Sequence, residues 1–249
     1  MTTLLSAECC KFPRNKITPV CLTGIVLQAI IQVTGDGALQ GHLAVAKIDS
    51  MSPFLCIWLS AFVSFFVAAE FQHGAIRNTL SLGKGRTQVY LSKQASVFIA
   101  TFAFTFLSAI LAVVVSSARD GFGNASPTEF LRFFAMIFLL QLLNHFVYAA
   151  LFNLFAFISK NAAATALCGV GFIIVEMVSI SILGQLGGIG LAIRQAFPYY
   201  YVSLLYGADY QIYGYADAAF VTRSIIVSVV SIALISAVGA YIFKRSDIK

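Results

Sequence analysis

Charged side chains are scarce in this sequence: Asp, Glu, Lys and Arg make up only 10% of its 249 residues. Soluble globular domains carry about a quarter of their residues as charged groups, so this class is excluded. Hydrophobic residues make up 59%, and the mean hydropathy is +0.89. The net charge of +6 is small and scattered, which argues against nucleic-acid binding and fits basic loops beside anionic lipid. The composition therefore predicts a polytopic membrane protein.

Metal-ligand and enzyme signatures are also missing. The five cysteines show no CxxC spacing and no grouping with the three histidines, so neither a disulfide framework nor a zinc site is expected. The sequence contains no HExxH or GxSxG pattern. An intramembrane enzyme that uses His145 and Glu176 is the one enzymatic alternative that remains open. We expect a protein without enzymatic activity of its own.

A nucleotide-binding loop is absent as well, although the passage TLSLGKGRTQVYLSK (79–93) contains a Gly-Lys-Gly core. A phosphate loop requires GxxxxGK followed by Ser or Thr, between a strand and a helix. Here Lys84 is followed by Gly85, and position 78 is Asn. No cofactor is therefore expected on this chain.

Six stretches are long and apolar enough to cross a bilayer, which takes about 20 residues. They cover residues 17–34, 53–70, 95–116, 131–158, 162–183 and 219–243. The first is interrupted by Gln28 and Gln32, and the fourth is long enough to tilt or to extend beyond the bilayer. We expect an all-α integral membrane protein with a single transmembrane domain over 1–249, in which 1–16 forms an interfacial helix.

The basic residues are distributed unevenly between the two sides of this predicted bundle. With the N-terminus inside, eleven of the 16 Lys and Arg residues fall on the cytoplasmic side, so both termini are expected there. Segment 184–218 is then external. It starts glycine-rich, and 199–215 holds seven of the ten tyrosines, which is typical of rings at the membrane–water boundary. We expect an interfacial or re-entrant segment there, or an aromatic anchor without a role in transport.

Polar residues inside the spans are candidates for a translocation path. Four residues of the fourth span stand at i, i+3, i+4 and i+7 and so share one helix face: Gln141, Asn144, His145 and Tyr148. Lipid does not solvate such a stripe, so it should face protein or a water-filled path. Glu176 in the fifth span is ionisable and is a functional candidate for that reason. Gln28 completes the predicted path; the alternative is hydrogen bonding that only holds the helices together.

Three features together resemble one family of membrane proteins. They are the N-terminal LLSAECCKFPRNK, in which Glu8 stands three residues before Lys11, the stretch EFQHGAIRNTLSLGKGRTQVYLSKQ after the second span, and a large loop before the last span. They resemble the six-span permeases of ABC-type exporters, the ABC type-2 class, which includes bacteriocin-immunity, antibiotic-resistance and peptide-export subunits. The loop residues that match in order are Glu70, Gly74, Leu80, Gly83, Arg86 and Lys93, with Ala75 in place of the usual Thr.

The resemblance implies that two permease copies pair and that each docks a separate cytosolic ATPase, which binds ATP and Mg. The loop helix, 71–82, would be the coupling helix, ended by Gly83. Glu70 would pair with a nearby Arg or cap this helix, while Arg86 and Lys93 hold the entry of the third span at the cytoplasmic surface. The implied docking residues are Glu70, Phe71, His73, Gly74, Arg77 and Asn78.

The expected function is export across the cell membrane, most simply a bacterial plasma membrane, by alternating access. The 23 phenylalanines and the sparse, mostly uncharged polar set favour a hydrophobic or amphipathic cargo such as a peptide. One alternative is a peptide-antibiotic resistance or immunity permease of the same class. Another is an ATP-independent carrier or channel that uses Glu176 and His145 as proton sites.

Overall fold

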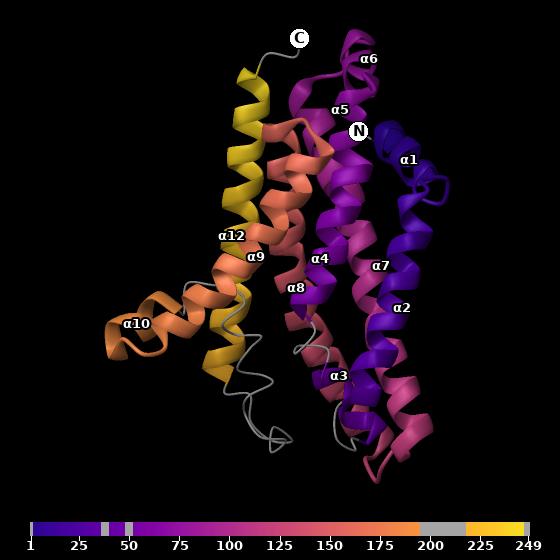
Figure 1. The fold of residues 1–249 in the computed structure, drawn as a ribbon, viewed down its shortest axis with the longest axis vertical. Helices are drawn as coiled ribbons and strands as arrows, with labels where there is room; N and C mark the ends of the chain where they lie inside the picture. The colour runs from indigo at the N-terminus through magenta and orange to yellow at the C-terminus, as the bar shows by residue number, and fades with distance from the viewer. Residues whose placement is uncertain (1, 36–39, 48–51, 195–217, 247–249) are drawn as a thin grey trace.

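The structure is a computed structural model that describes residues 2–35, 40–47, 52–194 and 218–246. Within these ranges every regular element is helical, which confirms the predicted all-α class (Figure 1). The elements in chain order are α1 (Thr2–Lys11), α2 (Ile17–Gly35), the 3-10 turn η1 (Gly41–Leu43), α3 (Ala44–Lys47), α4 (Ser52–Val63), the π-helical turn η3 (Ser64–Ala68), α5 (Ala69–Gln72), α6 (Ala75–Ser81), α7 (Arg86–Asp120), α8 (Pro127–Ser159), α9 (Ala162–Leu183), α10 (Gly187–Arg194) and α12 (Ala218–Arg245).

Five helical stretches are long and apolar enough to cross a membrane, and they coincide with predicted spans two to six. They are Pro53–Gln72, Arg86–Asp120, Pro127–Ser159, Ala162–Leu183 and Ala219–Arg245. The first predicted span corresponds to α2, whose described apolar part, Ile17–Ile31, is shorter. The 19 residues of α2 extend about 28 Å at the usual rise, close to the hydrocarbon thickness. A sixth crossing by α2 therefore stays a prediction.

The turn between α8 and α9 shows how local sequence sets the helix ends. Asn161 begins α9, because its side-chain oxygen accepts a hydrogen bond from the Ala164 amide at 3.1 Å. Lys160, at φ 52°, ends α8 just before it. At its other end α8 starts from a capping box made by Ser126 and Glu129. The helix is longer than the predicted 131–158 because these caps, and not the limits of the apolar run, decide where it begins and ends.

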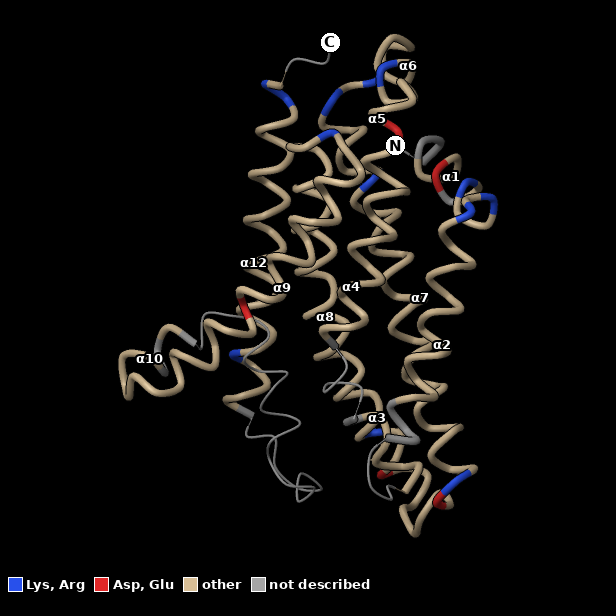
Figure 2. Tube along the Cα trace, viewed as in Figure 1, with Lys and Arg blue, Asp and Glu red and all other residues tan. Residues whose placement is uncertain are grey.

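One end of the bundle gathers most of the basic residues, and we call it the basic end. Figure 2 shows Lys and Arg concentrated around α1, the α5–α6 region and the last turns of α12. Arg86 at the start of α7 donates hydrogen bonds to the carbonyls of Lys244 and Ser246, which fixes the end of α12 there. Helix α1 and the end of α12 therefore lie at the same end, as the prediction of both termini on one side requires (Figure 1). Which side of the membrane this is stays a prediction.

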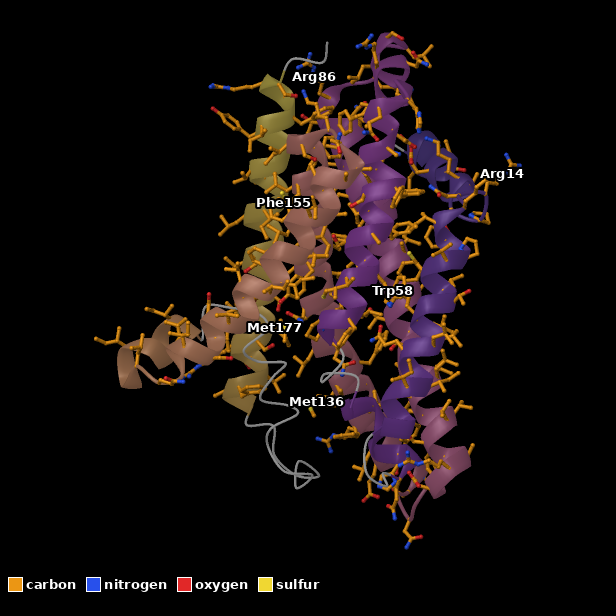
Figure 3. The ribbon with its side chains drawn as sticks, in the orientation of Figure 1. Arg14, Trp58, Arg86, Met136, Phe155 and Met177 are labelled. Carbon is orange, nitrogen blue, oxygen red and sulfur yellow. The ribbon has the colours of Figure 1, made fainter. Side chains whose placement is uncertain are left out.

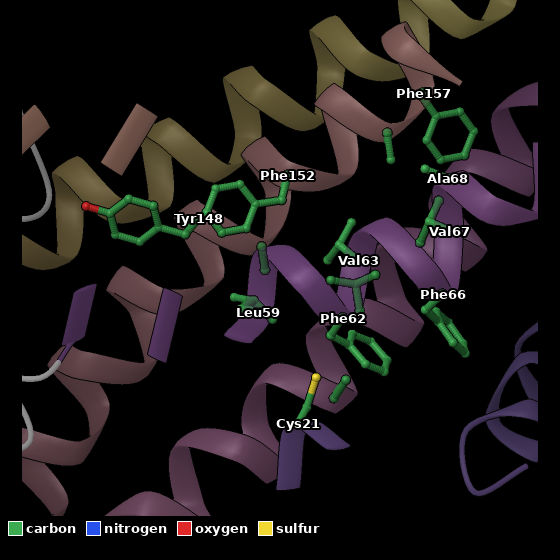
Figure 4. Close-up of a cluster of buried hydrophobic side chains, with 14 of the residues drawn as sticks. Cys21, Leu59, Phe62, Val63, Phe66, Val67, Ala68, Tyr148, Phe152 and Phe157 are labelled. Atoms are coloured by element: carbon green, nitrogen blue, oxygen red, sulfur yellow. The ribbon is translucent and has the colours of Figure 1, made fainter. Parts of the chain in front are cut away.

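The core behind the basic end combines aliphatic side chains with several aromatic rings (Figure 4). Phe62 stacks on Phe66 with 4.9 Å between ring centroids and meets Phe104 edge-on at 5.3 Å. Phe12, just after α1, lies 5.4 Å from Phe62. These contacts connect α4, η3 and α7, and they anchor the α1–α2 turn to them, since offset and edge-on ring pairs add to apolar burial.

The predicted external segment 184–218 is described only in part. Its helix α10 turns away from the bundle (Figure 1), with Ile189 and Ile193 exposed. The tyrosine-rich 199–215 lies outside the described residues. Its interfacial or re-entrant position stays a prediction.

Candidate functional site

Four charged side chains meet where α1, α5 and α7 come together. Lys93 Nζ of α7 lies 2.5 Å from Glu8 Oε2 of α1 and 2.6 Å from Glu70 Oε2 of α5. Lys11 Nζ lies 2.9 Å from Glu8 Oε1 and 3.1 Å from Glu70 Oε1. Each carboxylate therefore binds both ammonium groups. We call these four residues the charge cluster.

The charge cluster is balanced, and two of its members, Glu8 and Lys93, are buried, whereas the Lys11 side chain is 44% exposed. The Lys93 side chain is 2% exposed, and its ammonium also lies 5.1 Å from the centre of the Phe66 ring. Burial would by itself raise the pKa of Glu8, but the Lys93 charge and the hydrogen bonds from Lys93 and Lys11 outweigh it and hold this pKa below its ordinary value. Burial would lower the pKa of Lys11, yet Glu8 and Glu70 hold it above its ordinary value. Glu8 and Lys11 are therefore charged at neutral pH.

Two sequence predictions about this cluster are wrong. Glu70 pairs with lysines and not with an arginine, and it does not cap the loop helix, because α6 starts after Gly74 and has no side-chain cap. Lys93 was expected to hold the entry of the third span at the cytoplasmic surface, but its side chain is buried against Glu8 and Glu70. In the sequence, the i, i+3 spacing of Glu8 and Lys11 already indicated that these two residues form an ion pair with each other. Their connection to Glu70 and Lys93 follows only from the packing of α1 across the bundle.

The loop between α5 and α7 contains a shorter helix than the continuous 71–82 that was expected. The chain ends α5 at Gln72 and turns at Gly74, whose φ of 71° lies in the left-handed region that favours glycine. Helix α6 then covers Ala75–Ser81, and Gly83, at φ 78°, follows its end as predicted. A helix through 71–82 is prevented by the left-handed turn.

The structure separates the predicted docking residues into an inner and an outer set. Phe71 packs edge-on against Phe157 at 5.2 Å and Phe243 at 6.2 Å, so it braces α8 and α12 and does not form the loop surface. Glu70 is held in the charge cluster. The outer set is exposed: His73, Arg77, Asn78 and Leu82. Leu82, which sequence reasoning did not single out, is 79% exposed. The sequence marks it only as an apolar residue within a polar loop.

The polar stripe of α8 is buried, in agreement with the expectation that it avoids lipid. Gln141 Nε2 donates to the Val45 carbonyl at 3.1 Å, and His145 Nδ1 lies 3.1 Å from Thr105 Oγ1. The Tyr148 hydroxyl donates to Glu176 Oε2. Asn144 is 1% exposed, and neither of its amide atoms has a hydrogen-bond partner among the described residues. The stripe thus connects α8 to α3, α7 and α9.

The predicted path residues do not all come together. Tyr148 and Glu176 form a direct pair between α8 and α9. Gln28 lies elsewhere, in a mostly apolar cavity of about 430 Å³ between α2 and α4 that Gly24 and Trp58 also line. Whether any of these residues contacts cargo stays a prediction.

The helical bundle, its five membrane-length helices and the braced loop at the basic end define a multi-pass membrane protein. The family model described as ABC-2 family transporter protein matches residues 4–176. This match covers well over half of the chain, including the charge cluster, the loop and Glu176, so the chain belongs to the ABC-2 transporter family. No curated protein matched the sequence.

Proposed function

We propose that this chain is the permease subunit of an ATP-driven exporter and that its ATPase is a separate cytosolic protein. The observation that carries the proposal is the loop of α6, which exposes its outer set at the basic end while its base is tied to four helices. Glu70 binds α1 and α7 through the charge cluster. Phe71 packs on α8 and α12. Membership of a transporter family supports the same function.

This arrangement suits the transmission of force. A partner that binds α6 acts on a short helix whose base cannot shift without breaking buried ion pairs or opening the contacts of Phe71. Breaking buried charge pairs is costly, so the attached helices would move with the loop as rigid bodies. ATP and Mg would act on the ATPase, and its closure would move the permease between inward-open and outward-open states.

The membrane orientation and the assembly follow from the same proposal. The basic end would face the cytoplasm, since Lys and Arg are enriched in cytoplasmic loops (Figure 2). The membrane would be a bacterial plasma membrane. Helices α9 and α12 expose much of their apolar surface, for example at Leu167 and Leu234, and this surface is available to lipid and to a second permease copy. Crosslinking of cysteines on these faces would identify the pairing.

For the cargo we propose a hydrophobic or amphipathic molecule, most simply a peptide. The buried polar groups of the bundle are mostly amides and hydroxyls and carry little charge, which suits an apolar cargo better than an ion. A foreign peptide antibiotic would use the same mechanism, so the resistance or immunity function is a variant of this proposal. A proton-driven carrier is the second candidate, because Glu176 is buried at 5% exposure within a membrane helix and bound to Tyr148.

The docking proposal is tested by Gly74→Trp with Gly121→Trp as the control. A Cβ atom at either glycine meets nothing within 4 Å, and both residues have a positive φ, 71° and 78°. Gly74 has ψ 6° and lies in the left-handed helical region, whereas Gly121 has ψ 162° and lies in a region almost restricted to glycine, so the control variant carries at least as much backbone strain. Gly121 follows the far end of α7. We expect Gly74→Trp to reduce co-purification with the co-expressed partner ATPase at least tenfold. Substrate-stimulated ATP hydrolysis should fall by the same factor, and Gly121→Trp should change neither quantity much. An undiminished complex with Gly74→Trp would overturn the docking assignment.

A further inference from the structure

A second cavity, of about 920 Å³, lies at the basic end between the α1–α2 turn and the segment η3–α5. Its polar wall comes from the turn, where Arg14 and Lys16 are both exposed. Its apolar wall comes from Val20 of α2 and from Phe65 and Phe66 of η3. Val20 is 54% and Phe65 53% exposed, so the cavity opens on the outer surface of the bundle. Figure 3 shows Arg14 at that outer edge.

The polar wall carries positive charge that the chain does not neutralise. Glu70 and Lys11 also line the cavity, but their charges are balanced within the charge cluster by Glu8 and Lys93. Among the ion pairs of the described residues, none includes Arg14 or Lys16. The turn therefore presents two free cations beside the cavity. An anionic ligand group is the complement to such a pair.

The cavity also crosses the expected boundary between headgroups and hydrocarbon. Arg14 and Lys16 lie before Ile17, where α2 begins, whereas Phe65 lies within the membrane-length stretch Pro53–Gln72. A ligand that fills the cavity must thus combine a negative headgroup with an apolar tail. Soluble phosphate would satisfy the cations but would leave Phe65 and Val20 uncovered.

We propose that this cavity binds an anionic phospholipid. Its phosphate contacts Arg14 and Lys16, and its acyl chains lie along Val20 and Phe65. The planar guanidinium of Arg14 matches two phosphate oxygens, and the Lys16 ammonium adds a point charge. The bound lipid forms a bridge from the α1–α2 turn to η3 and so holds α1 against the bundle. The segment η3 is followed directly by α5, which contains Glu70. The lipid assignment does not rest on the proposed transport function, although Glu70 and His73, which also line the cavity, belong to the base and the outer set of the loop.

The test uses the purified full-length chain, delipidated in detergent and titrated with dioleoyl-phosphatidylglycerol while bound lipid is measured by native mass spectrometry. Dioleoyl-phosphatidylcholine tests the need for net charge, and inorganic phosphate and glycerol 3-phosphate test the need for acyl chains. The site variant is Arg14→Gln/Lys16→Gln. The matched control, Lys84→Gln/Lys244→Gln, removes two exposed cations of the basic end that do not line the cavity. Phe65→Ser tests the apolar wall, and thermal unfolding verifies that each variant is folded.

We expect saturable binding of phosphatidylglycerol to weaken about 25-fold in Arg14→Gln/Lys16→Gln, because each basic residue near an anionic lipid contributes about fivefold. Phe65→Ser should weaken it several-fold, and the control should not change it. Equal affinity of the site variant and the control would overturn the proposal. Binding of inorganic phosphate or glycerol 3-phosphate as tight as that of phosphatidylglycerol would also overturn it and would identify a soluble phosphate site. Equal binding of the two lipids would overturn the proposal as well, because the net charge of the headgroup would then not be recognised.

Discussion

The ammonium of Lys93 lies 2.6 Å from the carboxylate of Glu70 and joins the first turns of α7 to the helix that leads into the α6 loop. Both residues belong to the sequence pattern by which the chain resembles ABC type-2 permeases. The structure gives this pattern a physical meaning, because the two charges close the base of the loop. Glu8 and Lys11 extend the pair to α1, so that three segments meet at one ionic contact.

Removal of Lys93 should be far more harmful than removal of an exposed lysine. Lys93→Met leaves Glu8 and Glu70 close together with only Lys11 to balance them, and breaking a buried pair typically costs about 3–5 kcal/mol. Lys84→Met, at an exposed position, should change stability by less than about 0.5 kcal/mol. Unfolding in detergent, followed by circular dichroism, measures both, and Lys93→Met/Glu8→Gln should recover part of the loss. Equal stability of the two single variants would contradict a stabilising role of the charge cluster.

The docking of α1 should depend on pH only near the two extremes. The pKa of Glu8 is lowered, so its stabilising contribution is complete above the ordinary carboxyl pKa and is lost as pH falls through the folded value, below about pH 4. The pKa of Lys11 is raised, so its contribution is complete below its ordinary value and is lost at pH above about 10.4. A spin label on the exposed Cys10, with Cys9 and Cys168 replaced by serine, would report the mobility of α1.

Between these limits the label should keep one mobility, and it should gain mobility in acid. Glu8→Gln is the control for the acid transition, because it removes the titrating carboxyl and should abolish the Glu8-dependent part of this change. An identical acid transition in the variant would assign the transition to another group.

Two glycines of α9 should respond differently to the same substitution. A Cβ at Gly169 would overlap the Ser60 side chain of α4 and lie 3.3 Å from the Phe152 ring, whereas a Cβ at Gly171 meets nothing within 4 Å. Gly169→Val should therefore destabilise the bundle by about 1–3 kcal/mol more than Gly171→Val. Both carry the same change of helix propensity, so the difference in unfolding midpoint isolates the contact between α4 and α9. Equal unfolding midpoints of the two variants would show that α9 moves away from α4 without loss of stability.

The Tyr148–Glu176 pair distinguishes an ATP-driven exporter from a proton-driven carrier. Glu176→Gln retains an oxygen that accepts from the Tyr148 hydroxyl, but it cannot exchange a proton at neutral pH. For the exporter we expect at least half of the ATP-dependent export to remain in vesicles that contain the ATPase. Complete loss of transport at normal membrane levels, together with proton-driven transport by the unaltered chain without any ATPase, would favour the carrier. Tyr148→Phe is the companion variant, since it removes the hydrogen bond that Glu176→Gln retains, and it keeps the acid.

The sequence predicted well the properties that depend on neighbouring residues. Five of the six spans were located because twenty apolar residues can be satisfied in a bilayer only as a helix. The left-handed glycine after α6 and the buried face of the α8 stripe followed from local rules of the same kind. The start of the loop helix at Ala75 was missed, because the turn at Gly74 depends on how α5 ends against Phe157 and Phe243.

By itself, then, the sequence determined the class of protein, its helical content, most of its spans and the loop by which it resembles its family. Hydropathy, helix caps and glycine conformation act over a few residues, so they can be read without a fold. Only the tertiary structure decided that Glu8, Lys11, Glu70 and Lys93 form one cluster, that Phe71 faces inward, and that Gln28 lies apart from the stripe. These relationships join residues distant in the chain, and they arise from the packing of helices whose partners no local pattern specifies.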